Sequence, residues 1–328
     1  MKIVCDDKIP FLKGVFEPYA EVVYLPGAAI TAADVRDAAA LITRTRTRCG
    51  RALLEGSSVR VIASATIGYD HIDTAWCEEH GITWANAPGC NSGSVAQYIG
   101  SALVVLSKRF DFDLGSMTLG IVGVGHVGTK VARVAQALGM RVLLNDPPRA
   151  AAEGPEGFVS LDEIFAKSDI ITLHVPLTEE TRHMIDAERL SQMRPSQILI
   201  NTSRGEVVDG EALKSALRAR RLAAAVLDVW ENEPDIDPEL AQLVEIATPH
   251  IAGYSLDGKA AGTTAAVRVV ARALGITKLK DWSANLPSAA GNDEYDVTRD
   301  SDALKSDLSA FEHLRNSYPV RREPQVFH

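Results

Sequence analysis

The sequence contains only four cysteines among its 328 residues, and no two of them have C-x-x-C spacing. They stand far apart, at Cys5, Cys49, Cys77 and Cys90. Scattered thiols of this kind are typical of a chain in a reducing compartment, and they disfavour a disulfide framework, a cysteine metal site or a cysteine nucleophile. We therefore expect buried or incidental thiols and no bound metal.

Long apolar runs and an excess of basic residues are also missing. No uninterrupted apolar stretch approaches the roughly 20 residues that a membrane-spanning helix requires. The first ten residues, MKIVCDDKIP, reach acidic residues too early for a secretory signal. The net charge of −9 disfavours nucleic acid as the main partner, although it permits a local basic pocket for a small anion. These features predict a cytoplasmic protein that binds neither a membrane nor a nucleic acid.

The length and the alternation of segments predict an α/β protein. A chain of 328 residues suffices for about two domains, each with its own core. In the first 90 residues, strand-like runs alternate with helical or turn segments, which is typical of a parallel sheet. The predicted strands cover residues 2–5, 21–25, 40–43, 59–63 and 82–85. Helical or turn segments are predicted at residues 31–39, 51–55 and 73–80, with Thr31 as a helix cap.

The most informative stretch covers residues 119–146 and reads as strand, glycine turn, helix and strand. Its first apolar run is followed by GVGHVG, which fits the pattern G-x-G-x-x-G. The first glycine permits the tight turn, the second lets the backbone approach a pyrophosphate, and the third lets the helix pack on the strand. The unpaired N–H groups at the helix N-terminus favour phosphate oxygens. The residues expected at the phosphates are Gly123, Gly125, His126, Val127 and Gly128.

An acidic residue stands at the end of the second strand of this stretch. Asp146 follows Gly123 by 23 residues, a distance at which a carboxylate can accept hydrogen bonds from the adenosine ribose of a dinucleotide. Strand, glycine turn, helix and acid together favour a dinucleotide site over the alternative, a tight strand–helix turn without a ligand.

Two loops in the first 90 residues carry polar groups at predicted strand ends, where parallel sheets bind ligands. Residues 43–48 alternate Thr and Arg, so an extended conformation would place Arg44, Arg46 and Arg48 on one side. These arginines form either a solvated basic edge or an anion pocket, since a guanidinium matches phosphate and carboxylate geometry. The second loop, residues 65–73, can present backbone N–H groups near Thr66 to a carboxylate. We interpret its two aspartates as turn and helix-cap residues.

After residue 91, a helix over residues 92–108 leads into a second series of strands, at residues 119–122, 170–175, 198–201, 223–229 and 244–247. Polar clusters follow these strands and should gather at one edge of the sheet. Three of their residues form a chemical set: a histidine base (His250), a carboxylate that can orient it (Glu233) and an arginine that can grip a substrate carboxylate (Arg204). Taken singly, each residue has an ordinary structural alternative, as an ion pair, a surface residue or a satisfied histidine.

The motifs around this set are NTSRGEVVD, LDVWENEP and TPHIAG, and they resemble successive signatures of the D-isomer-specific 2-hydroxyacid dehydrogenases. The resemblance covers residues 1 to about 275. It implies two Rossmann-like or flavodoxin-like parallel-sheet domains: a substrate-binding domain of residues 1–91 with 258–280, and an NAD-binding domain of residues 92–257. It also implies Arg204, Glu233 and His250 as catalytic residues. Asp146 would repel the 2′-phosphate of NADP, so the implied cofactor is NAD.

The same resemblance assigns further site residues. Thr45, Thr66 and Tyr254 would contact the substrate, with Arg204 on its carboxylate and Arg44 or Arg46 on a phosphate. The residues implied at NAD, besides the glycine motif, are Asp146, Val175, Ser203, Arg204, Gly205, Asp228 and Gly253.

Four segments, MKIVCDD, IASATIGYDHID, APGCNSGS and HIAGYSLDG, resemble one branch of the family that oxidises a phosphorylated 2-hydroxy acid. Residues 281–328 resemble that branch's C-terminal dimerisation segment and imply a homodimer. Two alternatives stay open. The first is a family member with another substrate, such as 3-phosphoglycerate, hydroxypyruvate or glyoxylate. The second is an NAD-sensing transcriptional scaffold that keeps the cofactor site and works through protein partners.

Overall fold

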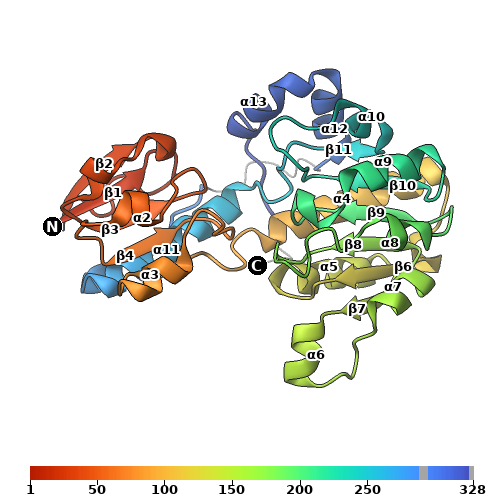
Figure 1. The fold of residues 1–328 in the computed structure, drawn as a ribbon, viewed down its shortest axis with the longest axis horizontal. Helices are drawn as coiled ribbons and strands as arrows, with labels where there is room; N and C mark the ends of the chain where they lie inside the picture. The colour runs from red at the N-terminus through yellow and green to blue at the C-terminus, as the bar shows by residue number, and fades with distance from the viewer. Residues whose placement is uncertain (288–294, 325–328) are drawn as a thin grey trace. The chain divides into compact units, whose positions relative to one another are not determined.

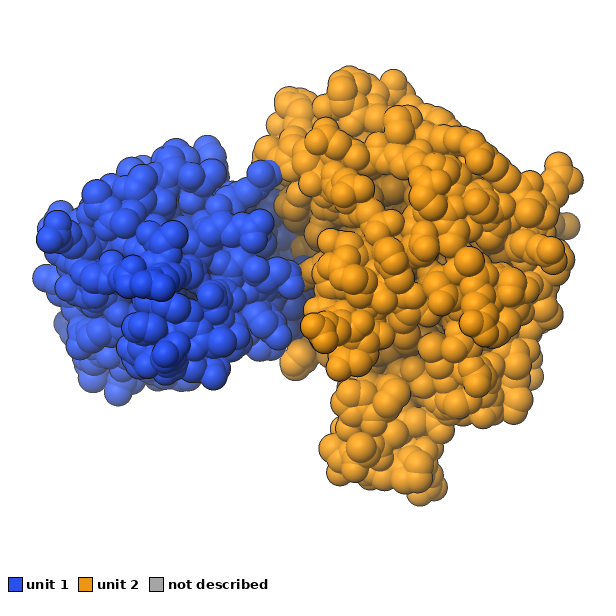
Figure 2. Space-filling model, in the orientation of Figure 1, with its two compact units in different colours: residues 1–91, 255–291 blue, residues 92–254, 292–328 orange. Residues whose placement is uncertain are grey.

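The computed structural model of the chain describes residues 1–287 and 295–324 (Figure 1). These residues divide into two compact units, each built from two separate stretches of the chain (Figure 2). Unit 1 combines residues 1–91 with the described residues from 255 to 287, and unit 2 combines residues 92–254 with residues 295–324.

Unit 1 is built on a sheet of five parallel strands in the order β2-β1-β3-β4-β5, which is the flavodoxin-like order. The strands are β1 (Lys2–Asp6), β2 (Glu21–Leu25), β3 (Ala38–Thr43), β4 (Val61–Ser64) and β5 (Thr83–Ala85). Its helices are α1 (Ala32–Val35), α2 (Arg51–Leu54), α3 (Thr74–Glu79) and α11 (Leu256–Ala273), with short 3₁₀ turns at Gly27–Ala29 and Thr277–Leu279.

Successive side chains of these strands point to opposite faces, and each face has its own apolar core. Leu41 and Ile62 belong to the core on the face of α1, α2 and α3. Ile42 lies in the opposite core, together with Val267 and Val270 of α11. Helix α11 therefore belongs to this sheet although more than 160 residues of sequence separate it from β5, and Figure 1 shows it beside β4.

Unit 2 contains a sheet of six parallel strands in the order β11-β10-β9-β8-β6-β7. The strands are β6 (Thr118–Val122), β7 (Arg141–Asn145), β8 (Ile170–Leu173), β9 (Ile198–Asn201), β10 (Ala224–Leu227) and β11 (Ile246–Ala247). From β6 the chain first adds β7 on one side and then β8 on the other. The carboxyl ends of β6 and β8 thus form the topological switch point, where open parallel sheets bind ligands.

Helices cover both faces of this second sheet (Figure 1). They are α4 (Ser92–Phe110), α5 (His126–Ala137), α6 (Pro147–Glu153), α7 (Leu161–Lys167), α8 (Ala187–Ser191), α9 (Gly210–Arg218), α10 (Pro238–Leu243), α12 (Val297–Ser306) and α13 (Phe311–Asn316), with 3₁₀ turns at Leu114–Ser116, Gly205–Val207 and Leu308–Ala310. Leu304 and Phe311 of the C-terminal helices are fully buried in the core that contains Leu240 and Ala247. The C-terminal residues are therefore an integral part of unit 2.

The predicted α/β fold class is confirmed, and most predicted strands agree with the structure to within two residues. The helical or turn segment predicted over residues 31–39 is wrong at its end, because α1 and the turn after it stop before Ala38, where β3 begins. Ala38, Ala40 and Leu41 are fully buried in the sheet, and this burial outweighs the helical preference of an alanine run. The predicted cap is correct, since Thr31 forms a capping box with Asp34.

The cysteines match the expectation from the sequence. Cys5, Cys49 and Cys77 are buried, free thiols, and Cys90 is half-buried. Burial raises the pKa of Cys49 to about 12 and that of Cys77 to about 11, so neither is a reactive thiolate at neutral pH. Across residues 1–287 and 295–324, no helix combines the length and the apolar character needed to cross a membrane.

Helix α11 approaches the first sheet so closely that Gly262 has no room for a side chain. A Cβ atom on Gly262 would lie 2.2 Å from the backbone oxygen of Ala65. We expect Gly262→Ala to lower the free energy of unfolding by about 1–3 kcal/mol through overpacking, measured by urea denaturation. Gly50→Ala is the matched control, since its Cβ would meet its nearest neighbour, Asp73 Cβ, at 3.4 Å. Equal stability of the two variants would contradict this packing argument.

Candidate functional site in unit 2

The glycine turn after β6 has the geometry of a phosphate-binding loop. Gly123 has a φ of +87°, and a Cβ on Gly128 would lie 2.1 Å from the Gly123 backbone oxygen, so both positions require glycine. No atom lies within 4 Å of the position that a Cβ of Gly125 would take, so a ligand can approach this backbone. His126 begins α5 and is exposed, and Val127 is half-buried against the core.

Asp146 connects this turn to the strand that follows it in the chain. Its Oδ2 accepts a hydrogen bond from Val124 N at 2.8 Å, and its Oδ1 accepts one from Arg149 N at 3.0 Å, which caps α6. The guanidinium of Arg149 is bonded to Glu153 through two contacts of 2.7 Å and to Val124 O at 2.7 Å. The arginine nearest to the acid is thus already paired with a carboxylate, which favours NAD over a cofactor with an added phosphate.

The loop after β9 carries Ser203, Arg204 and Gly205. Ser203 Oγ donates to Asn201 Oδ1 at 2.8 Å, and Arg204 Nη1 donates to the Ser203 backbone oxygen at 2.8 Å. A Cβ on Gly205 would lie 2.0 Å from the carbonyl carbon of Trp230. This close backbone approach holds the Arg204 loop against the loop that follows β10.

Glu233 and His250 form a hydrogen-bonded pair. His250 Nδ1 lies 2.8 Å from Glu233 Oε2, and Glu233 Oε1 accepts a hydrogen bond from Trp230 N at 3.0 Å. The side chains are 18% and 32% exposed for Glu233 and His250, so water screens the pair only in part. Burial alone would raise the pKa of Glu233, but the bond and charge of His250 and the Trp230 N–H outweigh it and hold this pKa below its ordinary value. With Nδ1 engaged by a carboxylate, Nε2 is the histidine nitrogen left for a substrate.

Asp228 fixes the backbone that carries His250. His250 has a φ of +57°, a left-handed conformation, and its N–H donates to the Asp228 backbone oxygen at 2.8 Å. The Asp228 carboxylate accepts from Thr248 Oγ1 at 2.6 Å, from Ile251 N at 2.8 Å and from Ala252 N at 2.9 Å. We expected Asp228 only as a residue of the NAD site, and its role as an anchor of the loop after β11 was missed.

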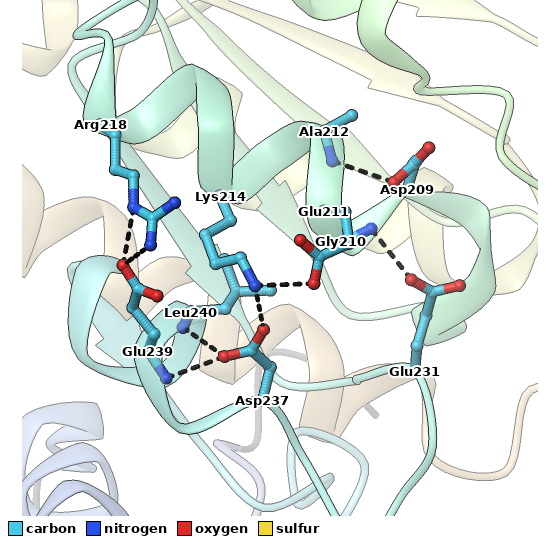
Figure 3. A network of polar contacts seen from close by, with 10 residues as sticks. All are labelled: Asp209, Gly210, Glu211, Ala212, Lys214, Arg218, Glu231, Asp237, Glu239 and Leu240. Carbon is cyan, nitrogen blue, oxygen red and sulfur yellow. Dashed lines mark hydrogen bonds and ion pairs between the residues drawn. The ribbon is translucent and has the colours of Figure 1, made fainter.

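A polar network anchors the loop between β10 and α10 on both sides of Glu233 (Figure 3). On one side, Glu231 Oε2 accepts from Gly210 N at 2.9 Å, at the start of α9. On the other side, Asp237 caps α10 and binds Lys214 Nζ at 2.5 Å, while the same ammonium binds Glu211 at 2.6 Å. Hydrogen bonds to α9 therefore hold the loop on both sides of Glu233 and fix the position of its backbone. A small cavity of about 130 Å³ lies beneath this loop and is lined in part by Gly205, Trp230 and Leu240.

The sequence-predicted residues of unit 2 gather at the carboxyl edge of its sheet. Arg204, Glu233 and His250 follow β9, β10 and β11, which are neighbours in the sheet. Val175 follows β8, and its Cγ1 would lie 3.0 Å from a Cβ on Gly123. Tyr254, just after Gly253, packs edge-on against Tyr318, with ring centroids 5.9 Å apart. Among the described residues no group of three or more His, Cys, Asp or Glu side chains is arranged to hold a metal ion.

The remaining predicted residues lie in unit 1, after β3 and β4. Thr66 is half-buried and its hydroxyl lies 2.8 Å from Ser64 Oγ, while Thr45 and Arg46 are exposed. Arg44 Nε lies 3.4 Å from Oδ2 of the buried Asp6. Residues 43–48 are not extended throughout, so the condition for placing the three arginines on one side is not met. Residues 45–47 bend, and the buried Thr47 hydroxyl donates inward to Gly27 O at 2.9 Å.

Comparison with known proteins gives three consistent findings. The family model described as "D-isomer specific 2-hydroxyacid dehydrogenase, NAD binding domain" matches residues 104–252. An erythronate-4-phosphate dehydrogenase of Bacteroides fragilis is 52% identical, and the match covers 100% of this chain and 98% of that protein. An erythronate-4-phosphate dehydrogenase of Ectopseudomonas mendocina is 42% identical, and the match covers 98% of this chain and 93% of that protein. Among solved structures, D-lactate dehydrogenase from Aquifex aeolicus, complexed with NAD and lactic acid, is similar with a TM-score of 0.73 and 28% identity over 88% of this chain and 100% of that one.

The Asp228 carboxylate accepts hydrogen bonds from three donors. In an asparagine at this position, one of the two oxygens is replaced by an NH₂ group, which cannot accept a hydrogen bond. We expect Asp228→Asn to lower the free energy of unfolding by about 1–3 kcal/mol, because a buried donor loses its acceptor. Chemical denaturation followed by circular dichroism measures this loss. Asp209→Asn is the matched control: Asp209 caps α9 through Ala212 N at 2.9 Å, and asparagine caps helices equally well. An equal loss of unfolding free energy in both variants would contradict the role of Asp228 as the acceptor that holds the loop after β11.

Proposed function

Because the chain belongs to the D-isomer specific 2-hydroxyacid dehydrogenase family, we propose that it oxidises 4-phospho-D-erythronate at C2 with NAD. The product is (R)-3-hydroxy-2-oxo-4-phosphobutanoate, and the reaction belongs to pyridoxal 5′-phosphate biosynthesis. The observation that carries this proposal is the 52% identity, over the whole chain, to an erythronate-4-phosphate dehydrogenase. The hydrogen-bonded Glu233–His250 pair at the edge of the second sheet supports the same chemistry.

The residues of unit 2 can perform the proton transfer that this oxidation requires. His250 takes the proton of the C2 hydroxyl on Nε2, while Glu233 orients the ring through Nδ1 and favours the imidazolium that forms. Arg204 binds the substrate carboxylate and polarises the oxygen that becomes a carbonyl. When bound, NAD supplies the acceptor for the C2 hydride. The residues that would hold it are Gly123, Gly125, His126, Val127, Gly128, Asp146, Val175, Ser203, Arg204, Gly205, Asp228 and Gly253.

The substrate has a carboxylate at one end and a phosphate at the other, so it requires two cationic or N–H-rich contacts. Thr45, Thr66 and Tyr254 are the remaining substrate contacts that we propose. For the phosphate we propose Arg44 or Arg46, of which Arg44 already lies beside the buried carboxylate of Asp6. Unlike Arg149, which makes three contacts of 2.7 Å, Arg44 meets the carboxylate through Nε at 3.4 Å, and the Nη donors of a guanidinium match the oxygens of a phosphate.

The domain roles follow from the same assignment. Residues 1–91 with 258–280 act as the substrate-binding domain, residues 92–257 as the NAD-binding domain, and residues 281–328 as a dimerisation segment of a cytoplasmic homodimer. Residues 288–294 and 325–328 of that segment lie outside the described residues.

A turnover assay tests this function directly. We expect the purified protein with NAD and an oxo-acid acceptor to oxidise 4-phospho-D-erythronate in preference to 3-phosphoglycerate, glycerate or glycolate. Glycerate and glycolate are the hydroxy acids that correspond to hydroxypyruvate and glyoxylate. His250→Gln should lose turnover by about 10²–10⁴-fold while it keeps NAD binding, since only the base is removed. Preference for another acid would identify a different member of the family. NAD binding without turnover of any acid would identify a scaffold.

The phosphate contact has a separate test, in which kinetic constants are measured for two substrates. We expect Arg44→Ala and Arg46→Ala, made singly, to show which arginine binds the phosphate. The variant that removes it should raise KM about tenfold or more for 4-phosphoerythronate and little for an unphosphorylated 2-hydroxy acid, because one charged contact is lost. Arg48→Ala, an exposed arginine of the same segment, is the matched control. An equal loss with both substrates would contradict the assignment.

A further inference from the structure

The C-terminal residues contact the loops that carry the catalytic pair. Arg321 Nη2 donates to the backbone oxygens of Ile251 and Ala252, at 3.3 and 2.5 Å, directly after His250. Its guanidinium lies 4.4 Å from the ring centroid of Tyr295. The N–H groups of Ile251 and Ala252 donate to the Asp228 carboxylate. In these two residues, Asp228 thus bonds the backbone N–H groups and Arg321 bonds the backbone carbonyl groups. The C-terminal residues therefore help to define the backbone beside the base.

Arg315 of α13 contacts a side chain of the Glu233–His250 pair itself, whereas Arg321 contacts only the backbone after His250. Its Nη1 lies 3.8 Å from Glu233 Oε2, the same oxygen that is 2.8 Å from His250 Nδ1. The Arg315 side chain is only 18% exposed, so water screens this ion pair weakly. Although burial lowers the pKa of Arg315, Tyr254 and Glu233 outweigh it and raise this pKa above its ordinary value. The arginine is therefore a permanent cation beside the carboxylate.

The cation acts on a carboxylate that is largely removed from water. Desolvation favours the protonated form of Glu233, and a protonated carboxyl would lose its ability to orient His250 as an anion. The Arg315 guanidinium adds to the effect of His250 and the Trp230 N–H, because a cation within 4 Å stabilises the anion. Two further titratable groups of the described residues lie beside Arg315: Glu312, 3.4 Å from its Nη1, and Tyr254.

We propose that Arg315 is a positioning residue that holds the Glu233 carboxylate in its contact with His250 Nδ1, so that the C-terminal segment completes the catalytic pair. Its role as a positioning residue for catalysis rests on the proposed function, whereas its electrostatic coupling to Glu233 does not depend on which acid the protein oxidises. The contact involves only atoms of unit 2. The resemblance to the family at large ends near residue 275, and Arg315 lies beyond that point.

The test compares Arg315→Met and Arg315→Lys with Arg299→Met, which removes an exposed arginine of α12. We expect Arg315→Met to lower kcat about tenfold with KM changed less than about threefold, because the loss falls on the transition state. Arg315→Lys should recover part of kcat, and Arg299→Met should match the wild type. A rise in KM with unchanged kcat would make Arg315 a substrate contact, and unchanged constants would also overturn the proposal.

A second measurement separates this inference from the proposed function. In protein labelled with ¹³C at the glutamate carboxyl carbons, the resonance missing from Glu233→Gln identifies Glu233. We expect it to titrate at a higher pH in Arg315→Met than in the wild type, because a cation that stabilises the carboxylate and lowers its pKa is removed. Arg315→Lys, which keeps the charge, should titrate close to the wild type and also serves if Arg315→Met does not fold. No shift, or a downward shift, would overturn the coupling even if the enzyme proved to act on a different acid.

Discussion

The hydrogen bond between Glu233 and His250 Nδ1 joins two loops that begin on neighbouring strands of a parallel sheet. A bond of 2.8 Å between side chains on separate loops requires that both backbones be held to within a fraction of an ångström. The surrounding contacts meet this requirement. Asp228 holds the backbone after β11, Trp230 N–H holds the second oxygen of Glu233, and the network in Figure 3 ties the flanks of the Glu233 loop to α9.

Close backbone approaches impose a second constraint on the same edge of the sheet. Gly128 lets α5 pack on the turn after β6, and Gly205 lets the loop after β9 touch the backbone of Trp230. At both positions a Cβ would lie within about 2.1 Å of a backbone atom, so no rotation of a side chain could make room for it. The Arg204 loop and the Glu233 loop are therefore spaced by backbone contact, which is stiffer than contact between flexible side chains. Stiffness of this kind is what preorganised catalysis requires.

Local sequence patterns predicted this fold well where one periodicity dominates. Buried parallel strands such as β9 are short apolar runs between polar turns, and the glycine motif with Asp146 marks a dinucleotide site through spacing alone. The pattern failed for residues 38–39, where an alanine run has a helical preference but the sheet contains it as the start of β3. It also failed for residues 45–47, because a hydrogen bond from Thr47 to the distant Gly27 decides their conformation. Contacts with distant residues leave no local periodicity in the sequence.

The same limit explains why Arg315 was not found from the sequence. An arginine in a short polar helix is indistinguishable from a solvated one until the fold brings it beside a carboxylate 82 residues earlier in the chain. The buried apolar residues of the C-terminal helices, Leu304 and Phe311, supply the packing that brings it there. Burial of Glu233 makes its ionised form costly, and a fixed cation offsets that cost more reliably than mobile water does. A segment expected only to join two subunits therefore also supplies charge to the Glu233–His250 pair, because the buried Phe311 and Arg315 lie on the same short helix, α13.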